Sequence, residues 1–158
     1  MKKPVKILLV EDDPADCRWT VEIFKEFHVP SEIRTVKDGA EALNFLYKKG
    51  EDEYHPDLII LDLYLPRIRG HEVLKAIKNN KNLNCIPVVI LTASNSPEDA
   101  EIANNTHVKC YISKPINYNG LLEIIKSTVK FGITIPSMPI TSKCRSGDIF
   151  SFKYPHIN

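Results

Sequence analysis

The sequence predicts an α/β domain built on a doubly wound sheet of five parallel strands. Short apolar runs alternate with longer amphipathic segments, and this alternation repeats five times along the chain. Runs that are apolar on both faces are typical of parallel strands, because helices cover such a sheet on each side. Crossovers between parallel strands are right-handed, which winds the sheet in two directions and places helices on both faces.

The apolar runs define the expected strands, and the amphipathic segments define the expected helices. The strands are predicted at residues 6–10, 31–36, 57–63, 86–92 and 109–113. The helices are predicted at residues 14–27, 39–49, 71–79, 97–105 and 119–131. Since one helix follows each strand, neighbouring strands should run in the same direction.

Capping residues mark several helix ends. Asp13 and Ser96 each precede a proline, and an N-cap residue followed by proline favours the start of a helix. Gly50 follows the second predicted helix, where glycine favours termination. These three positions fix the expected boundaries.

The first predicted helix has one large apolar stripe. Trp19, Ile23 and Phe27 recur every four residues. Side chains at this spacing lie on one face of a helix. We therefore expect this face to pack on the sheet rather than to contact a cofactor.

The chain has 158 residues, a normal length for one domain with one core. We assign residues 1–131 to this domain. Residues 132–158 contain three prolines and no helical period, and we interpret them as a C-terminal extension without a domain of its own. Packing of its apolar residues on the domain or on a partner subunit, and disorder, are equally compatible with the sequence.

Charge and hydropathy exclude several classes of partner. The 21 basic and 20 acidic residues leave a net charge of +1, so nothing in the overall charge favours nucleic acid or an anionic membrane. No apolar stretch approaches the roughly 20 residues of a membrane span. Acids follow the first apolar run where a secretory leader would carry small residues, and the four cysteines are scattered. We expect a cytoplasmic protein with reduced thiols.

Acidic residues follow two strands that should be neighbours in the sheet. Glu11, Asp12 and Asp13 follow the first strand, and Asp62 ends the third. Ligands of open parallel sheets bind at the carboxyl ends of the strands, so Glu11, Asp12 and Asp62 should converge there. Asp13 is better explained as the helix cap. Carboxylates at close range oppose one another's ionisation, and a hard cation relieves this conflict, which predicts a Mg²⁺ site.

A hydroxyl and an ammonium group should reach the same edge of the sheet. The fourth strand ends at Thr92, and Lys114 follows the fifth. Each residue alone is an ordinary feature of a strand end. Together with the acids and a divalent cation they supply what phosphoryl transfer to an aspartate requires, namely a nucleophile, charge neutralisation and groups that hold the phosphoryl oxygens. Asp62 is the predicted phosphoacceptor.

With this set of residues, the chain resembles the receiver domain of two-component response regulators. The match runs from Lys6 to about Phe131 and implies a flavodoxin-like fold with strand order 2-1-3-4-5. The family's functional positions correspond to Glu11, Asp12, Asp62, Thr92, Tyr111 and Lys114.

The resemblance also implies roles for these residues. Asp12 and Asp62 would ligate Mg²⁺ directly, and Glu11 would do so through water. The residue two positions past the aspartate, here Tyr64, would contribute its backbone carbonyl. The expected protein is a phosphoacceptor switch that catalyses only its own phosphorylation and dephosphorylation.

The switch itself would involve the fourth and fifth strands. Lys114 and Thr92 would hold the phosphoryl group, and Tyr111 would follow Thr92 as it moves inward. A role for Tyr111 as an ordinary core aromatic stays open. A cis peptide bond between Lys114 and Pro115 is a further expectation, because it would direct the amine into the pocket.

The resemblance implies a sensor histidine kinase as phosphoryl donor. The segments HVKCYISK and FGITIPSMP look most like stand-alone regulators paired with cyanobacterial phytochromes, and like similar archaeal proteins. This suggests a phytochrome-like kinase. Family behaviour further implies a homodimer through the face formed by the fourth helix, the fifth strand and the fifth helix.

Three other functions use the same fold. A flavin-binding module would need a loop of Ser, Thr and Gly after the first strand, where EDDP would repel the flavin phosphate. A phosphatase with an aspartyl nucleophile would want a second acid at position 64, which is Tyr64. A scaffold that is never phosphorylated is disfavoured because every pocket residue is present.

Overall fold

Five parallel strands form one sheet in the order β2-β1-β3-β4-β5, which confirms the predicted α/β fold with its doubly wound topology. The structure is a computed structural model, and it describes residues 4–26, 28–48, 54–93, 97 and 108–127. The strands are β1 (Val5–Val10), β2 (Ser31–Val36), β3 (Leu58–Leu61), β4 (Val88–Thr92) and β5 (Val108–Ser113). The helices are α1 (Pro14–Glu26), α2 (Gly39–Tyr47), α3 (Gly70–Asn79) and α5 (Tyr118–Ser127).

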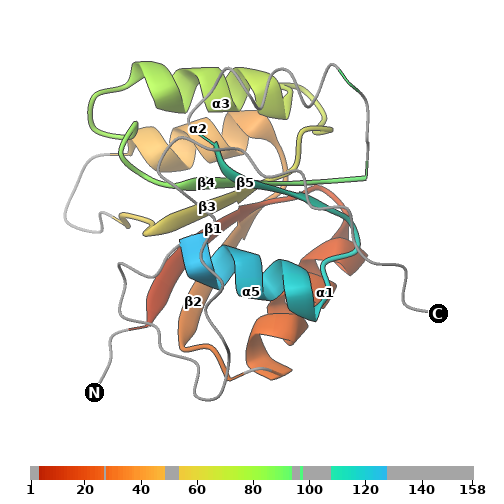
Figure 1. The fold of residues 1–158 in the computed structure, drawn as a ribbon. Helices are drawn as coiled ribbons and strands as arrows, with labels where there is room; N and C mark the ends of the chain where they lie inside the picture. The colour runs from red at the N-terminus through yellow and green to blue at the C-terminus, as the bar shows by residue number, and fades with distance from the viewer. Residues whose placement is uncertain (1–3, 27, 49–53, 94–96, 98–107, 128–158) are drawn as a thin grey trace.

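Helices cover both faces of the sheet. Figure 1 shows α2 and α3 together on one face and α1 and α5 together on the other. Within the described part of the chain, each helix is too short or too polar to serve as a membrane span. Because helices cover both faces of the sheet, the architecture is a three-layer α/β/α sandwich.

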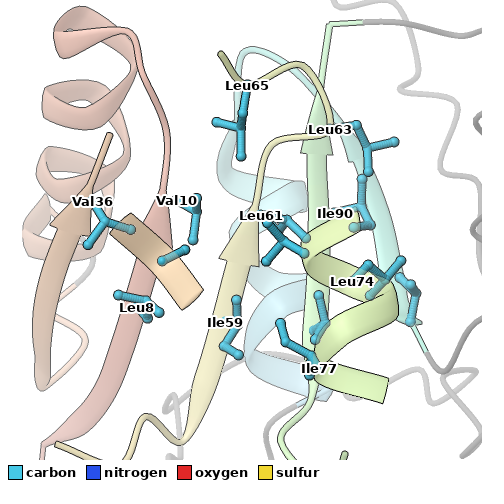
Figure 2. Packing of buried hydrophobic residues seen from close by; sticks show 14 of the residues in the cluster. Leu8, Val10, Val36, Ile59, Leu61, Leu63, Leu65, Leu74, Ile77 and Ile90 are labelled. Carbon is cyan, nitrogen blue, oxygen red and sulfur yellow. The ribbon is translucent and has the colours of Figure 1, made fainter. Parts of the chain in front are cut away.

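Two apolar clusters fill the spaces between the layers, and β1 supplies both. Leu8 and Val10 belong to the cluster beneath α2 and α3, whereas Ile7 and Leu9 belong to the cluster beneath α1 and α5. This alternation follows from the two-residue period of a strand. Figure 2 shows the first cluster, with side chains from several strands and from α3. Each fully buried Leu or Ile contributes about 1.5–3 kcal/mol to stability, so the central strands anchor the fold.

The central strands of the sheet are shielded from solvent, whereas the edge strand β2 is not. Every residue of β3 and β4 is buried, whereas in β2 only Val36 is buried and the other residues are exposed or half-buried. An apolar run such as LIILDL is thus explained by burial on both faces. The consequence is that Asp62, which follows β3 directly, lies at the end of the most deeply buried strand.

The predicted packing face of α1 is wrong at Trp19. The Trp19 side chain is 53% exposed, and its indole N–H donates a hydrogen bond of 2.6 Å to the carbonyl of Ile116. Ile23 is buried as predicted, together with Thr20 and Phe24, while Phe27 lies outside the described residues. A tryptophan with an apolar ring and a polar N–H suits the border of a packed surface, which a four-residue spacing cannot distinguish from its centre.

The caps of the first two helices are well defined. The Asp13 carboxylate accepts a hydrogen bond of 2.8 Å from the N–H of Ala15, which confirms Asp13 as the N-cap of α1. Asp38 caps α2 in the same way by accepting from the N–H of Glu41. Gly50 and Ser96, the other two predicted boundary residues, lie outside the described residues.

Two predicted segments are described only in part. Of the helix expected at 97–105, Pro97 alone is described, and its backbone is helical. The helix expected at 119–131 is α5, described to Ser127. The predicted extension at 132–158 lies outside the described residues.

A close backbone approach holds the start of α3 against the end of β3. A Cβ atom added at Gly70 would lie 2.3 Å from the carbonyl oxygen of Asp62 and 2.6 Å from the Cα of Leu63. The N–H of Gly70 donates to the carbonyl of Leu63 at 3.1 Å. Because the obstructing atoms belong to the backbone, no side-chain rotation relieves the clash.

We predict that Gly70→Ala destabilises the domain by about 1–3 kcal/mol, the usual cost of an overpacked position. The measurement is the urea midpoint of unfolding. Glu72→Ala is the control, because Glu72 is exposed in the same helical turn and its replacement should change stability by about 0.5 kcal/mol or less. An unchanged midpoint for Gly70→Ala would contradict the close approach.

Candidate functional site

The pairing of β1 with β3 brings the first two acids together. Val10 is paired with Leu61 at the end of the ladder, so Glu11 and Asp62 are the next residues on neighbouring strands. The N–H of Asp62 donates to the carbonyl of Val10 at 3.0 Å, which extends the pairing by one residue. Glu11 is 1% exposed and Asp62 is 4% exposed. Two carboxylates are thus held side by side with little access to water.

Asp12 completes a cluster of three carboxylates. Oxygen atoms of Glu11, Asp12 and Asp62 all lie within 4.8 Å of one another, and Asp12 is exposed where the other two are buried. Three hard oxygen donors at this spacing suit a hard divalent cation. Glu11 Oε1 accepts a hydrogen bond from the N–H of Asp13 at 3.1 Å. The donor set and its geometry therefore fit the predicted metal site.

The next strands bring Thr92 and Lys114 to the same edge. Leu61 is paired with Ile90, and Thr92 follows two residues later, fully buried. Thr92 is in turn paired with Ser113, and the N–H of Lys114 donates to the carbonyl of Thr92 at 2.8 Å. The peptide bond between Lys114 and Pro115 is cis, as expected. The four predicted strand ends thus converge.

The Lys114 ammonium group lies among three carboxylates. Its Nζ is 2.5 Å from Glu11 Oε2, 2.8 Å from Asp62 Oδ2 and 3.0 Å from Asp16 Oδ2. The contact with Glu11 is an ion pair without ordinary hydrogen-bond geometry, and Oε2 has no other hydrogen-bond partner among the described residues. Its partner is an ammonium group that it shares with Asp62 and Asp16, so the charge on this buried oxygen is incompletely neutralised and the atom is well suited to a cation or to a water bound to one.

Burial and charge shift the ionisation of this group of residues. Burial, reinforced by the charge of Asp62, raises the pKa of Glu11 to about 7, although Lys114 and the N–H of Asp13 act in the opposite direction. Burial lowers the pKa of Lys114, but the hydrogen bonds to Asp62 and Asp16 and the close contact with Glu11 outweigh it and raise that pKa overall. Lys114 is therefore charged at neutral pH, and one ammonium does not fully offset the clustered acids.

Asp16 is a site residue that the sequence patterns did not identify. It lies in the first turn of α1, its side chain is 39% exposed, and it contacts Lys114 directly. Its position three residues after the cap Asp13 could have indicated it, because the first turn of the helix after β1 begins at the carboxyl edge of the sheet, where the site lies. For the first turn of α1, the sequence patterns indicated only that Asp13 caps the helix.

Both oxygens of the Asp62 carboxylate have protein partners. Oδ1 accepts a hydrogen bond of 3.0 Å from the N–H of Tyr64, and Oδ2 accepts from Lys114. The Tyr64 side chain is 51% exposed beside the site. Tyr111 is 7% exposed and belongs to the apolar cluster beneath α2 and α3, paired with Ile90 rather than placed among the carboxylates.

Cys17 lies next to this edge as a free thiol. It is half-buried, and its S–H donates weakly to the carbonyl of Glu11 at 3.5 Å. Burial and the charges of Glu11 and Asp16 raise the pKa of its thiol to about 11. Cys17 therefore remains protonated at neutral pH, and it supplies no thiolate nucleophile to the site.

Comparison with known proteins agrees with this geometry. Residues 7–126 match the family model of the response regulator receiver domain. The chain is 39% identical to the response regulator Rcp1 of Synechocystis sp. over 138 residues, which cover 86% of this chain and 94% of Rcp1.

Solved structures show the same similarity. The phosphorylated cyanobacterial phytochrome response regulator RcpA has 42% identity and a TM-score of 0.69, covering 85% of this chain and 99% of RcpA. The Mn²⁺-bound form of Rcp1 has 37% identity and a TM-score of 0.69, covering 88% of this chain and 100% of that one. Since the family model spans most of the chain and the relatives exceed 30% identity, the chain belongs to the response regulator receiver domain family of two-component signalling, whose members act as phosphoacceptor switches.

Proposed function

We propose that this protein is a stand-alone receiver that accepts a phosphoryl group from a sensor histidine kinase on Asp62. The observation that carries the proposal is the position of the Asp62 carboxylate, which lies between the Glu11 and Asp12 carboxylates on one side and Lys114 on the other. An oxygen of Asp62 would form a bond to phosphorus as the bond between phosphorus and the histidine nitrogen of the kinase breaks. No other acid in the cluster is both buried and bound to Lys114 through an ordinary hydrogen bond.

We further propose Mg²⁺ as the cation of this site. Asp12 and Asp62 would bind it directly, Glu11 through water, and Tyr64 through its backbone carbonyl. The cation would supply charge neutralisation for the phosphoryl oxygens. Oxygen donors favour a hard ion, and the three carboxylates of Glu11, Asp12 and Asp62 support this choice. Rcp1 has been solved in an Mn²⁺-bound form, and Mn²⁺ is an ion that also accepts oxygen ligands.

The residues at the ends of β4 and β5 would hold the product and transmit the change. Lys114 would contact one phosphoryl oxygen, and the hydroxyl of Thr92 another. Phosphorylation shifts the conformational equilibrium only by as much as these new contacts favour the active arrangement. Tyr111 is paired with Ile90, two residues before Thr92, so a movement of Thr92 toward Asp62 would alter the packing beside Tyr111.

The same site supports slow loss of the phosphoryl group through hydrolysis catalysed by the protein itself. No second acid lies at position 64, so the site lacks the residue that a phosphatase acting on other substrates would want. We propose that the protein acts on its own phosphoryl group and is otherwise a switch. Its expected location is the cytoplasm, where the kinase would phosphorylate it.

We predict that incubation with acetyl phosphate and Mg²⁺ adds one PO₃ group to the wild-type protein and none to Asp62→Asn. Asparagine keeps the shape of the side chain but lacks the nucleophilic carboxylate. Intact-protein mass spectrometry measures the gain, and removal of Mg²⁺ with a chelator should suppress it. Absence of a mass gain in the wild-type protein with this donor and with a phosphorylated kinase domain would refute the proposal.

The kinase and the oligomer are finer points of the same proposal. The similarity to RcpA, a cyanobacterial phytochrome response regulator, supports a phytochrome-like histidine kinase as partner. We also propose that phosphorylation controls a homodimer formed by the fourth helix, β5 and α5. The proposal is supported by the place of β5 at the end of the strand order among the described residues, with α5 packed beside it.

We predict that a phosphoryl mimic such as beryllofluoride with Mg²⁺ strengthens this dimer, because the mimic would contact Lys114, which follows β5 of the proposed face, and Thr92 at the end of the neighbouring strand β4. Sedimentation velocity over a concentration series measures the dissociation constant. Asp62→Asn is the control, and its dimerisation should not respond to the mimic. Equal wild-type affinity with and without the mimic would exclude a phosphorylation-sensitive dimer.

A further inference from the structure

Helix α1 contacts the segment that carries Lys114 through two side chains. Asp16 Oδ2 lies 3.0 Å from the Nζ of Lys114, and the indole N–H of Trp19 donates to the carbonyl of Ile116 at 2.6 Å. Asp16 and Trp19 are three residues apart, so they project from the same face of the helix. One bond reaches the side chain of the lysine, and the other fixes the backbone two residues later. The position of Lys114 therefore depends on α1 as well as on β5.

A lysine needs several partners to be held in one place. Its four-carbon chain is flexible, and its ammonium group has three donors and no acceptor. In this structure Glu11, Asp62 and Asp16 surround that ammonium. Lys114 is 13% exposed, so little water is available to replace a lost partner.

The three carboxylates differ in what else they do. Glu11 and Asp62 belong to the cluster whose oxygens lie within 4.8 Å of one another, whereas Asp16 does not. When Glu11 and Asp62 direct their oxygens toward a bound cation, their charge is compensated and their attraction for Lys114 falls. Asp16 lies outside the cluster, so its contact with Lys114 does not compete with a cation bound there.

We propose that Asp16 is a positioning residue that holds the Lys114 amine beside Asp62 while the cation site is occupied. The inference rests on the proposed phosphoryl transfer to Asp62, and it adds a residue that acts through Lys114 rather than on the phosphoryl group. In the structure as it stands, Asp16 is one of three partners of the amine. In the cation-bound protein it is the principal one.

The direct test is the mobility of the Lys114 ammonium, measured on the ¹⁵Nζ signal by NMR with and without Mg²⁺. We expect the wild-type signal to stay ordered and slowly exchanging in both conditions. In Asp16→Asn it should stay ordered without Mg²⁺, because Glu11 and Asp62 still hold it, and become mobile at saturating Mg²⁺. An amine that is as ordered in Asp16→Asn with Mg²⁺ as in the wild-type protein would overturn the proposal.

Asp13→Asn is a matched control. It removes one negative charge from the turn next to Asp16, and asparagine is as good an N-cap as aspartate, so the start of α1 should be preserved. Asp13 contacts Lys114 through none of the described interactions. Its replacement should therefore leave the ¹⁵Nζ signal of Lys114 ordered at saturating Mg²⁺. Equal loss of order in Asp13→Asn and Asp16→Asn would replace the proposed contact with a general effect of charge.

Kinetics provide a second readout. At saturating Mg²⁺ the phosphorylation rate constant with acetyl phosphate should fall about tenfold in Asp16→Asn and Asp16→Ala, the size expected for a lost hydrogen bond to a charged group. Asp16→Glu should recover part of the loss, Asp13→Asn should stay within about twofold, and the Mg²⁺ dissociation constant should be unchanged. Faster phosphorylation in Asp16→Asn would mean that Asp16 draws the Lys114 amine away from Asp62, which contradicts the proposal.

The two readouts separate this inference from the proposed function. If the wild-type protein accepts no phosphoryl group but the amine of Asp16→Asn becomes mobile with Mg²⁺, the positioning role holds and the proposed function fails. If the wild-type protein is phosphorylated and the amine does not respond to the substitution, the function holds and Asp16 is not a positioning residue.

Discussion

The parallel pairing of β1 with β3 is the constraint on which the site depends. The register in which Val10 faces Leu61 makes Glu11 and Asp62 the next residues on adjacent strands. A shift of one residue would turn the side chains of β3 to the opposite face of the sheet. The same apolar clusters that bury both faces of β3 therefore also fix the distance between the two buried carboxylates. The register of β1 with β3 thus determines both the packing of the core and the geometry of the site.

The charges at this edge oppose stability and serve function. Glu11 and Asp62 are almost fully buried, and the pKa of Glu11 is raised to about 7, mainly by that burial. Lys114 offsets part of this cost by contacting three carboxylates, but its one positive charge cannot neutralise all three of them. An arrangement of this kind stabilises a divalent cation and places an ammonium group beside the proposed nucleophile. The charge conflict that burial creates is thus the feature that favours the proposed cation.

Much of the fold was predictable because strand and helix periods are local properties of the sequence. All five strands and the four helices of the described residues lie where the apolar patterns place them, and the acids at the ends of β1 and β3 converge because the fold class dictates their adjacency. Trp19 was misplaced because a four-residue spacing fixes a face of a helix but not how that face is rotated about the sheet. Asp16 was missed because its contact with Lys114 joins residues 98 apart in the sequence, and its place in the first turn of α1 indicates nearness to the site but not this partner.

Calorimetric titration with Mg²⁺ at neutral pH tests directly whether the converging carboxylates of Glu11, Asp12 and Asp62 hold a cation. The predicted result is one ion bound per wild-type chain, with affinity reduced by at least about tenfold in Asp12→Asn and unchanged in Asp13→Asn, whose carboxylate caps α1 instead. No binding to the wild-type protein, or equal affinity in Asp12→Asn, would contradict the convergence of these acids on a shared ion.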